Sequence, residues 1–330
     1  MSKMLKAIRK LIAPKKTSSL TLNQLFWRYN HELPAGAIEL NTRATLAIHQ
    51  KHLLKVFGKD ILVEDIKPST YIRERSCQTF RNKPIGSRTI RKELATLRAL
   101  CNWAAHPNQG LITTPPNFTK LVFEKEDAQR PFLSWGEIET KIKQGSSPSL
   151  WDSLFLSVEE TRSLLEFVRA ATLPPFVYPL FCFAALTGAR RSEMLRCRLE
   201  DLALDKGEIV LREKKRCRTF KETFRRVFAP PSLVEAISNW LLVHPGDNKL
   251  FLLSPSMASF WFKESLRGSK WEVISGWHCL RHSTASNLAA AGTDPRIIDA
   301  LLGHMSRSMR DRYSHLFPSN VRDAVSRIYQ

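Results

Sequence analysis

The segment Thr187-Gly188-Ala189-Arg190-Arg191-Ser192-Glu193 marks the end of one predicted helix and the start of another. The apolar run Pro179–Leu186 before it is typical of a buried helix. Gly188 permits a tight turn, because glycine adopts backbone conformations that other residues avoid. A new helix begins directly afterwards, so we expect Arg190 to project its guanidinium from a rigid turn between two helices. A purely structural ion pair between Arg190 and Glu193 is equally compatible with the pattern.

A second short segment, His278-Cys279-Leu280-Arg281-His282, combines imidazole and guanidinium groups. On a helix, His278, Arg281 and His282 share one face. An arginine can hold two phosphate oxygens and a histidine can move a proton, so this face favours a phosphate site. The two histidines also have the spacing of a zinc pair, but no HExxH is present and Arg281 would repel a cation.

Two further segments follow near the C-terminus. A helix is predicted to begin at Asp294-Pro295 and to end at Leu301-Leu302-Gly303-His304. Tyr313 lies nine residues after His304. A helix-capping histidine and a surface or core tyrosine would explain these residues equally well. A phenol has a pKa of about 10, so Tyr313 would need help to act as a nucleophile at neutral pH.

The whole chain has 330 residues and a formal net charge of +20. This length predicts two domains. Residues 1–130 carry 23 Lys and Arg against 10 Asp and Glu, and the remaining 200 carry 28 against 21. Such an excess favours a polyanionic partner, above all nucleic acid; an anionic membrane surface and a merely soluble basic protein are the alternatives. No apolar run reaches the roughly 18–20 residues that a transmembrane helix needs.

The first 130 residues are predicted to form a basic tail, 1–17, and a helical domain, 18–130. The tail lacks the apolar core of a secretory signal and is either a free tail or an arm along DNA. Apolar residues recur at helical spacing in Leu20–Tyr29, Thr42–Phe57 and Ser87–Ala105. Between Tyr71 and Arg98 there are eight basic residues and two acids, which indicates a phosphate-tracking face or a solvated one. Pro115–Pro116 and the polar stretch 124–130 read as a linker.

The part from 131 to 330 is predicted to be a second domain, mainly α with one small antiparallel sheet. We expect helices over Trp135–Lys143, Val158–Ala170, Ser232–Val243, and from His278 to the end. The runs Glu208–Leu211 and Arg225–Phe228 indicate a hairpin. The chain contains no CxxC pair among its six cysteines, which suits reduced thiols in a cytosolic compartment.

Taken together, the four segments form the series TGxRxxE, HxxRH, LLGH and a tyrosine nine residues on. In this order and near these separations the series resembles the tyrosine recombinases, the phage-type integrases and their relatives. The resemblance covers residues 131–330, which would be the catalytic domain. Over 18–130 only the general plan of a basic, helical DNA core-binding domain is similar.

The resemblance implies a role for each matching residue. Arg190 and Arg281 match the two arginines that hold one DNA phosphate, and Tyr313 matches the nucleophile that forms a 3′-phosphotyrosyl link. His278 matches the general acid/base and His304 the residue that supports the scissile phosphate. Glu193 matches an acidic residue that orients the first arginine or its helix.

The family also uses a hairpin lysine as general acid toward the leaving 5′-oxygen. Lys215 has the usual distance from the start of the first strand, and we choose it. Lys214 is one residue off and would face the other side of the strand. Lys221 fits when counted back from the second strand, so all three remain candidates.

The resemblance further implies double-stranded DNA as partner and substrate, with no small-molecule substrate and no membrane. The phosphotyrosyl ester conserves bond energy, so neither ATP nor a metal is implied as cofactor. A tetramer on two DNA sites in the cytoplasm of a prokaryote, associated with the nucleoid, is the corresponding expectation. The competing hypotheses are a type IB topoisomerase-like enzyme, a catalytically inactive DNA-binding relative and a histidine-dependent metal hydrolase.

Overall fold

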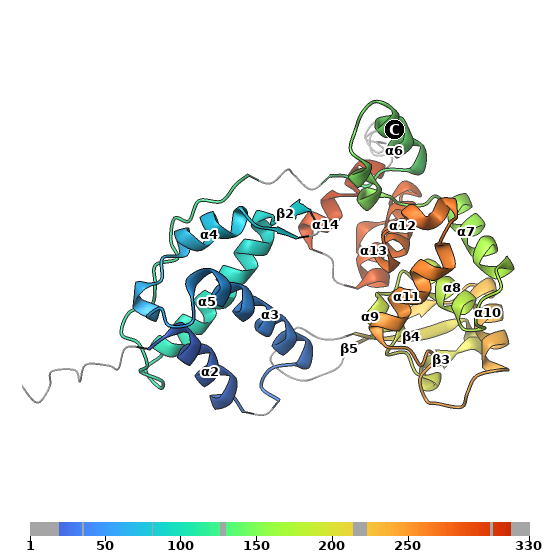
Figure 1. Ribbon diagram of the computed structural model, residues 1–330. Helices are drawn as coiled ribbons and strands as arrows, with labels where there is room; N and C mark the ends of the chain where they lie inside the picture. The colour runs from blue at the N-terminus through green and yellow to red at the C-terminus, as the bar shows by residue number, and fades with distance from the viewer. Residues whose placement is uncertain are drawn as a thin grey trace, which may run out of the picture. The chain divides into compact units, whose positions relative to one another are not determined.

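The computed structural model describes residues 20–34, 36–80, 82–125, 130–213, 223–303 and 306–317. The chain divides into two compact units, Met1–Ala128 and Gln129–Gln330, each with its own core (Figure 1). The prediction of a mainly helical protein with a small antiparallel sheet is confirmed.

The N-terminal unit is built on one long helix, α5. Its helices are α2 (Leu22–Glu32), α3 (Leu40–Phe57), α4 (Pro68–Ser76) and α5 (Ser87–Ala105), with a 3₁₀ turn at Val63–Asp65. Helix α5 packs against the other three, because Ile90, Leu94, Leu97 and Cys101 form one buried stripe at helical spacing. The expected helices are therefore present in this unit.

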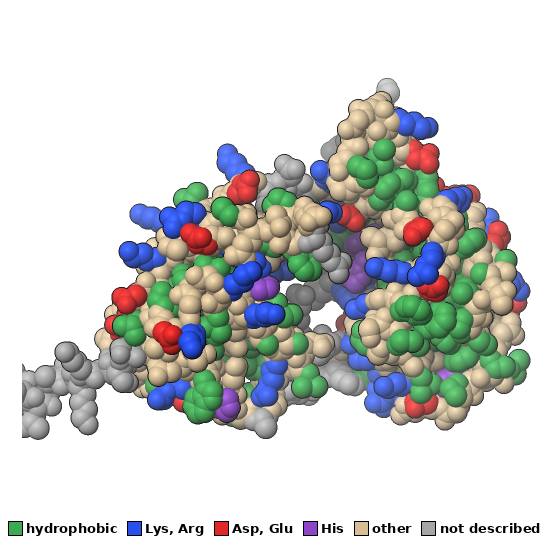
Figure 2. Space-filling model, viewed as in Figure 1, with side chains coloured by type: hydrophobic (Ala, Val, Ile, Leu, Met, Phe, Trp, Pro, Cys, Tyr) green, Lys and Arg blue, Asp and Glu red, His purple; other side chains and the backbone are tan. Residues whose placement is uncertain are grey.

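The basic stretch between Tyr71 and Arg98 differs from a continuous helical face. A short hairpin, β1 (Thr79–Phe80) and β2 (Lys83–Pro84), interrupts it, and this second sheet was not predicted. Arg75 is buried rather than facing outward. The surface view shows Lys and Arg side chains spread over this unit, with acids among them (Figure 2). The phosphate-tracking interpretation is therefore wrong for Arg75.

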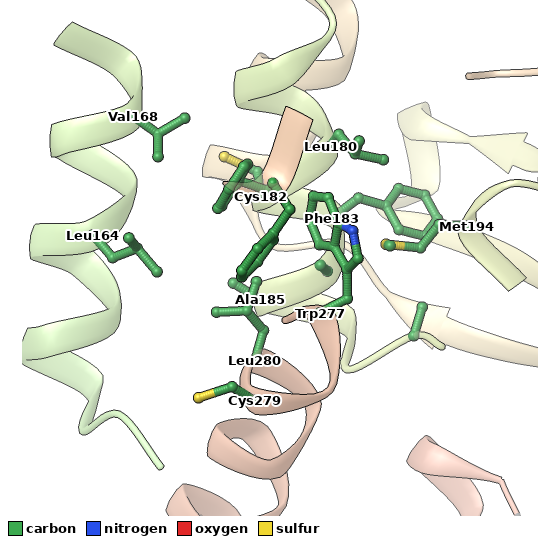
Figure 3. Packing of buried hydrophobic residues seen from close by; sticks show 14 of the residues in the cluster. Leu164, Val168, Leu180, Cys182, Phe183, Ala185, Met194, Trp277, Cys279 and Leu280 are labelled. Carbon is green, nitrogen blue, oxygen red and sulfur yellow. The ribbon is translucent and has the colours of Figure 1, made fainter. Parts of the chain in front are cut away.

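The C-terminal unit surrounds an apolar helix, α8 (Val177–Thr187). Its other α-helices are α6 (Trp135–Lys143), α7 (Val158–Ala170), α9 (Arg191–Met194), α10 (Pro231–Leu241), α11 (Pro255–Leu266), α12 (Trp277–Ala290), α13 (Pro295–Leu302) and α14 (Arg307–Asp311). Helix α8 packs against α7, α10 and α12. Figure 3 shows Leu180 and Phe183 of α8 among Leu164, Met194 and Trp277 from its neighbours. Helix α11 was not foreseen.

The sheet of this unit has three antiparallel strands in the order β3-β4-β5. They are β3 (Leu202–Ala203), β4 (Glu208–Glu213) and β5 (Thr223–Phe228); Ile209 pairs with Val227, and Leu211 pairs with Arg225. The predicted hairpin is thus longer than expected and gains a third strand. Ile209, Leu211 and Val227 are buried, and because strand residues alternate between faces, Arg225 lies on the same inner face as Val227.

Four short 3₁₀ segments complete this unit, Pro148–Ser153, Leu199–Asp201, Leu204–Lys206 and Lys270–Val273, and a fifth, Ser314–Leu316, follows Tyr313. A small separate core forms where α12 meets α13 and the segment around Tyr313, through Phe132, Phe155, Ala285, Ala289, Ile298, Leu302 and Tyr313. Asp294 caps α13 as expected, accepting a hydrogen bond from the Arg296 amide at 2.8 Å. None of the described helices is long and apolar enough to cross a membrane.

Candidate active site

The turn after α8 places Arg190 at the rim of the site. Gly188 has φ +61°, and a side chain there would collide with Leu302 and crowd Thr284. Glycine is therefore required by both the backbone conformation and the close approach of α12 and α13. Arg190 is the first residue outside α9 and keeps 34% of its side chain exposed.

Glu193 holds Arg190 in this position. One carboxylate oxygen of Glu193 accepts from the Arg190 backbone amide at 2.8 Å, and the other accepts from Arg190 Nη1 at 2.6 Å. The predicted Arg190–Glu193 pair is therefore present. Burial alone would raise the pKa of Glu193, but hydrogen bonds and charge from Arg225 and Arg190 outweigh it and lower this pKa to about 2.

Arg225, on β5, forms an arginine cluster together with Arg190 and Arg281. Its Nη2 donates to Glu193 Oε2 at 2.7 Å, its Nη1 to Glu213 Oε1 at 2.5 Å, and its Nε to the Leu301 carbonyl at 2.8 Å. It thus ties together α9, the end of β4 and the end of α13. Arg225 was predicted only to lie in a strand; the alternation with Val227 was the signal that could have shown its inward direction.

Arg281 reaches the same region from α12. Its Nη1 donates to the Gly188 carbonyl at 2.7 Å and its Nη2 to the Leu302 carbonyl at 2.5 Å. Burial, and then the positive charge of Arg190, lower the pKa of Arg281 to about 10. Because the two guanidinium groups destabilise each other's charge, a bound anion would relieve the repulsion.

The two histidines of α12 have different surroundings. His278 is exposed, yet neighbouring atoms remove part of the hydration of its ring. This desolvation, and then the positive charges of Arg281, Arg190 and Arg191, lower its pKa below the usual value. His282 is packed against Phe132, with ring centroids 4.4 Å apart, and burial lowers its pKa to about 3. His282 is therefore a neutral packing residue. Within the described ranges no three His, Cys, Asp or Glu side chains gather into a possible metal site.

Tyr313 follows α14 and is buried in the small core. Only 1% of it is exposed, and its hydroxyl has no hydrogen-bond partner among the described residues. Burial, then the negative charge of Asp299, raise its pKa to about 12, while Arg310 and Arg281 act in the opposite direction. Tyr313 shares this small core with Leu302, whose carbonyl accepts a hydrogen bond from Arg281, so the phenol lies next to the arginine cluster.

Four of the predicted site residues lie outside the described residues, namely His304, Lys214, Lys215 and Lys221. The described ends of the segments that carry them are Gly303, Glu213 and Thr223. A side chain on Gly303 would collide with Glu213 and meet Arg225 at 3.1 Å, so the chain approaches this cluster closely just before His304. The structure thus brings together Arg190, Arg281, His278 and, at the edge, Tyr313.

Comparison with known proteins identifies relatives of this chain. A family model described as the phage integrase family matches residues 155–320, half of the chain. Tyrosine recombinase XerA of Pyrococcus furiosus is 30% identical over 182 residues, covering 52% of this chain and 60% of the relative. Tyrosine recombinase XerC of Caldanaerobacter subterraneus is 26% identical over 194 residues, covering 53% and 50%. The chain therefore spans only half to three-fifths of these relatives.

Solved structures with the same fold cover nearly the whole chain. The Tn1549 transposon integrase in complex with transposon right end DNA superposes with a TM-score of 0.63 at 16% identity, covering 94% of this chain and all of that one. A lambda integrase dimer bound to a COC′ core site gives 0.61 at 15% identity, with coverages of 95% and 81%. At these identities the likeness shows the fold of both units.

Proposed function

This chain belongs to the phage integrase family, and we propose that it is a site-specific DNA recombinase that cuts and rejoins strands through Tyr313. The observation that carries the proposal is the cluster of Arg190, Arg281 and His278. These side chains come from two separated helical segments, and Arg190 and Arg281 are held by Glu193 and backbone carbonyls. Fixed, mutually repelling cations beside a histidine suit a phosphate whose negative charge grows during reaction.

In the proposed reaction the Tyr313 oxygen attacks the scissile phosphorus and the bond to the 5′-oxygen breaks. The tyrosine proton passes to His278, whose lowered pKa leaves it neutral at pH 7 and able to accept. The leaving 5′-oxygen takes a proton from the hairpin lysine, Lys215 by our choice, with Lys214 and Lys221 as the alternatives. Arg190 and Arg281 stabilise the phosphorane, and His304 supports it.

The phosphotyrosyl ester stores the energy of the broken bond. A 5′-hydroxyl from another strand can therefore attack it in the reverse sense and release Tyr313, without ATP or a metal. Glu193 and Arg225 act by positioning Arg190, since neither is exposed. Two DNA sites and four copies of the chain would complete the exchange, with the N-terminal unit holding the duplex, in the cytoplasm of a prokaryote.

The buried state of Tyr313 has a consequence for this reaction. Its hydroxyl must leave apolar surroundings before it can approach a phosphate, because a phenol with a pKa near 12 is a poor nucleophile at pH 7. The positive charge of the arginine cluster and a proton acceptor would then lower the cost of removing its proton.

The test is capture of a covalent protein–DNA adduct. The binding sequence is first selected from random duplexes, and the selected duplex is then nicked near its centre so that the cleaved strand cannot be rejoined. We expect an adduct in the presence of EDTA, and none with Tyr313→Phe. This variant should fold normally, since the lost hydroxyl has no partner among the described residues.

Each contrary outcome is informative. An adduct formed by Tyr313→Phe would remove Tyr313 from its assigned role, and loss of the wild-type adduct in EDTA would instead favour metal-dependent hydrolysis. Binding of the selected duplex without any adduct would favour an inactive DNA-binding relative. Relaxation of supercoiled DNA without exchange between two sites would favour topoisomerase-like activity over recombination.

A further inference from the structure

A second cationic pocket shares His278 with the arginine cluster. It is a surface pocket of about 290 Å³ whose lining includes Arg191, Ser259, Lys263, Ser275 and His278. The pocket takes Arg191 from α9, Ser259 and Lys263 from α11, and His278 from the start of α12. Nothing in the proposed cleavage reaction uses Arg191 or Lys263.

The pocket has a fixed floor. Phe262 and Trp277 line it, with ring centroids 4.6 Å apart, and Trp277 Nε1 donates to the Ala258 carbonyl at 3.1 Å. Arg191 Nη1 donates to Ser259 Oγ, and this hydroxyl in turn donates to the Pro255 carbonyl at 3.0 Å. The Arg191 guanidinium is therefore held in place before any ligand arrives.

Among the described residues, no acid forms an ion pair with Arg191 or Lys263. No carboxylate of these residues lines the pocket, although Glu272 lines the adjoining pocket together with Lys263. The nearest acids of α11 and the following turn are engaged elsewhere, since Glu264 pairs with Arg267 at 2.6 Å and Glu272 accepts from the Gly268 amide at 3.0 Å. Lys263 lies one helical turn after Ser259, on the same side of α11, and is exposed. The positive charges of Arg191 and Lys263 therefore favour binding of an anion.

The position of the pocket indicates which anion. His278 belongs both to the pocket and to the arginine cluster, and Arg191 directly follows Arg190 in the chain. A DNA strand carries a phosphate at every nucleotide, so the strand that the arginine cluster holds presents further phosphates on either side. We propose that Arg191 and Lys263 bind the backbone phosphate next to the one held by Arg190 and Arg281. This inference rests on the proposed function.

The experiment uses the full chain and the selected, nicked duplex. In each version of the duplex, one phosphate within three linkages of the cleaved bond is replaced by a neutral methylphosphonate. In the wild type, a neutral linkage should slow adduct formation at the scissile position and at one neighbour. In Arg191→Gln and in Lys263→Gln, adduct formation on unmodified DNA should fall about tenfold, the scale of one charged contact. The sensitivity at that neighbouring linkage should disappear in both variants.

Arg169→Gln is the matched control, because Arg169 is an exposed arginine of α7 paired with Glu235, makes the same change of charge and does not line the pocket. It should keep the wild-type pattern. If Arg191→Gln and Lys263→Gln keep the wild-type sensitivity at every linkage, the pocket proposal is wrong. If the wild type itself yields no adduct, the proposed function fails instead.

If the wild type yields no adduct, a binding measurement still tests the pocket proposal. The affinity for a random 30-base-pair duplex is measured against salt concentration, where each phosphate contact adds about 0.9 to the slope of log K against log salt. The slope should decrease by about this amount in Lys263→Gln and stay unchanged in Arg169→Gln. An unchanged slope in Lys263→Gln overturns the proposal.

Discussion

Glu93 in the N-terminal unit and Glu193 in the C-terminal unit are both almost fully buried, and each lies against a buried arginine. Glu93 accepts from Tyr71 Oη at 2.6 Å and from Arg75 Nε at 3.1 Å, and it also contacts His52 Nδ1 at 2.6 Å. Burial opposes ionisation of Glu93, yet these hydrogen bonds lower its pKa. Tyr71 and Arg75 lie inside this core, whereas the His52 side chain is 31% exposed and reaches the surface.

The network around Glu193 also reaches the surface, here through a guanidinium. Arg225 is buried beside this glutamate, but Arg190 is bonded to it from the rim and stays partly exposed. One cluster therefore fixes helices to one another, while the other fixes a cation at the surface. The comparison teaches that an outward partner alone does not mark a functional site: the one beside Glu93 is an imidazole, and the one beside Glu193 is a guanidinium that can hold a phosphate.

The largest expected effect comes from Arg225→Ala, which disrupts the cluster around Glu193. Glu193 loses its buried partner and can draw Arg190 inward, so we expect adduct formation to slow about a thousandfold, near 4 kcal/mol. Arg225→Lys should recover part of this loss, since it keeps the charge but not all three hydrogen bonds. The matched control is Arg226→Ala, the next residue of the strand, 78% exposed; an equal loss there would contradict a positioning role.

A smaller effect is expected from Glu93→Gln, which disrupts the cluster around Glu93. Removing one partner of a buried pair leaves Arg75 poorly compensated, so the N-terminal unit should lose about 3 kcal/mol of its unfolding free energy. Hydrogen exchange of peptides from this unit measures the loss, with the exposed Glu74→Gln as control. The rate of adduct formation at saturating DNA should stay within about threefold. A large rate effect would show that the two clusters are not distinct in kind.

The smallest effect concerns the histidines that accompany each cluster. His52 contacts a glutamate, whereas His278 faces arginines that lower its pKa below 6.5. His278 therefore stays neutral until the pH falls below that value, and only then loses its ability to accept a proton. Adduct formation should be flat above pH 6.5 and fall at lower pH by up to tenfold per unit. His278→Asn should remove this dependence; a transition above pH 6.5 would contradict the assignment.

Much of the candidate site could be predicted from short sequence segments, because its residues lie at helix ends and on helix faces. Gly188, Arg190 and Glu193 belong to one turn, and Arg281 is fixed by helical spacing. Arg225 was missed for a physical reason. In the pair Arg225-Arg226 either residue could face inward, and only the alternation with buried Val227 decides it.

The burial of Tyr313 depends on distant contacts. Its core is formed by residues from Phe132 to Leu302, so no local pattern distinguishes a surface tyrosine from a buried one. The hairpin β1–β2 was missed because each strand has only two residues, too few to show alternation. The functional roles of residues 18–130 and the hairpin lysine remain predictions.

The anchoring of Arg312 connects the beginning of the C-terminal unit to the proposed nucleophile. Phe132 donates its amide to the Arg312 carbonyl at 2.9 Å, Arg312 Nε donates to the Arg130 carbonyl at 2.9 Å, and the guanidinium lies 3.8 Å from the Phe132 ring centre. Tyr313 is the next residue. A pull on the chain at Arg130 would therefore strain the bonds that hold the residue beside Tyr313. The backbone at the start of the C-terminal unit is thus coupled to the residue before Tyr313 by two hydrogen bonds and one cation–π contact.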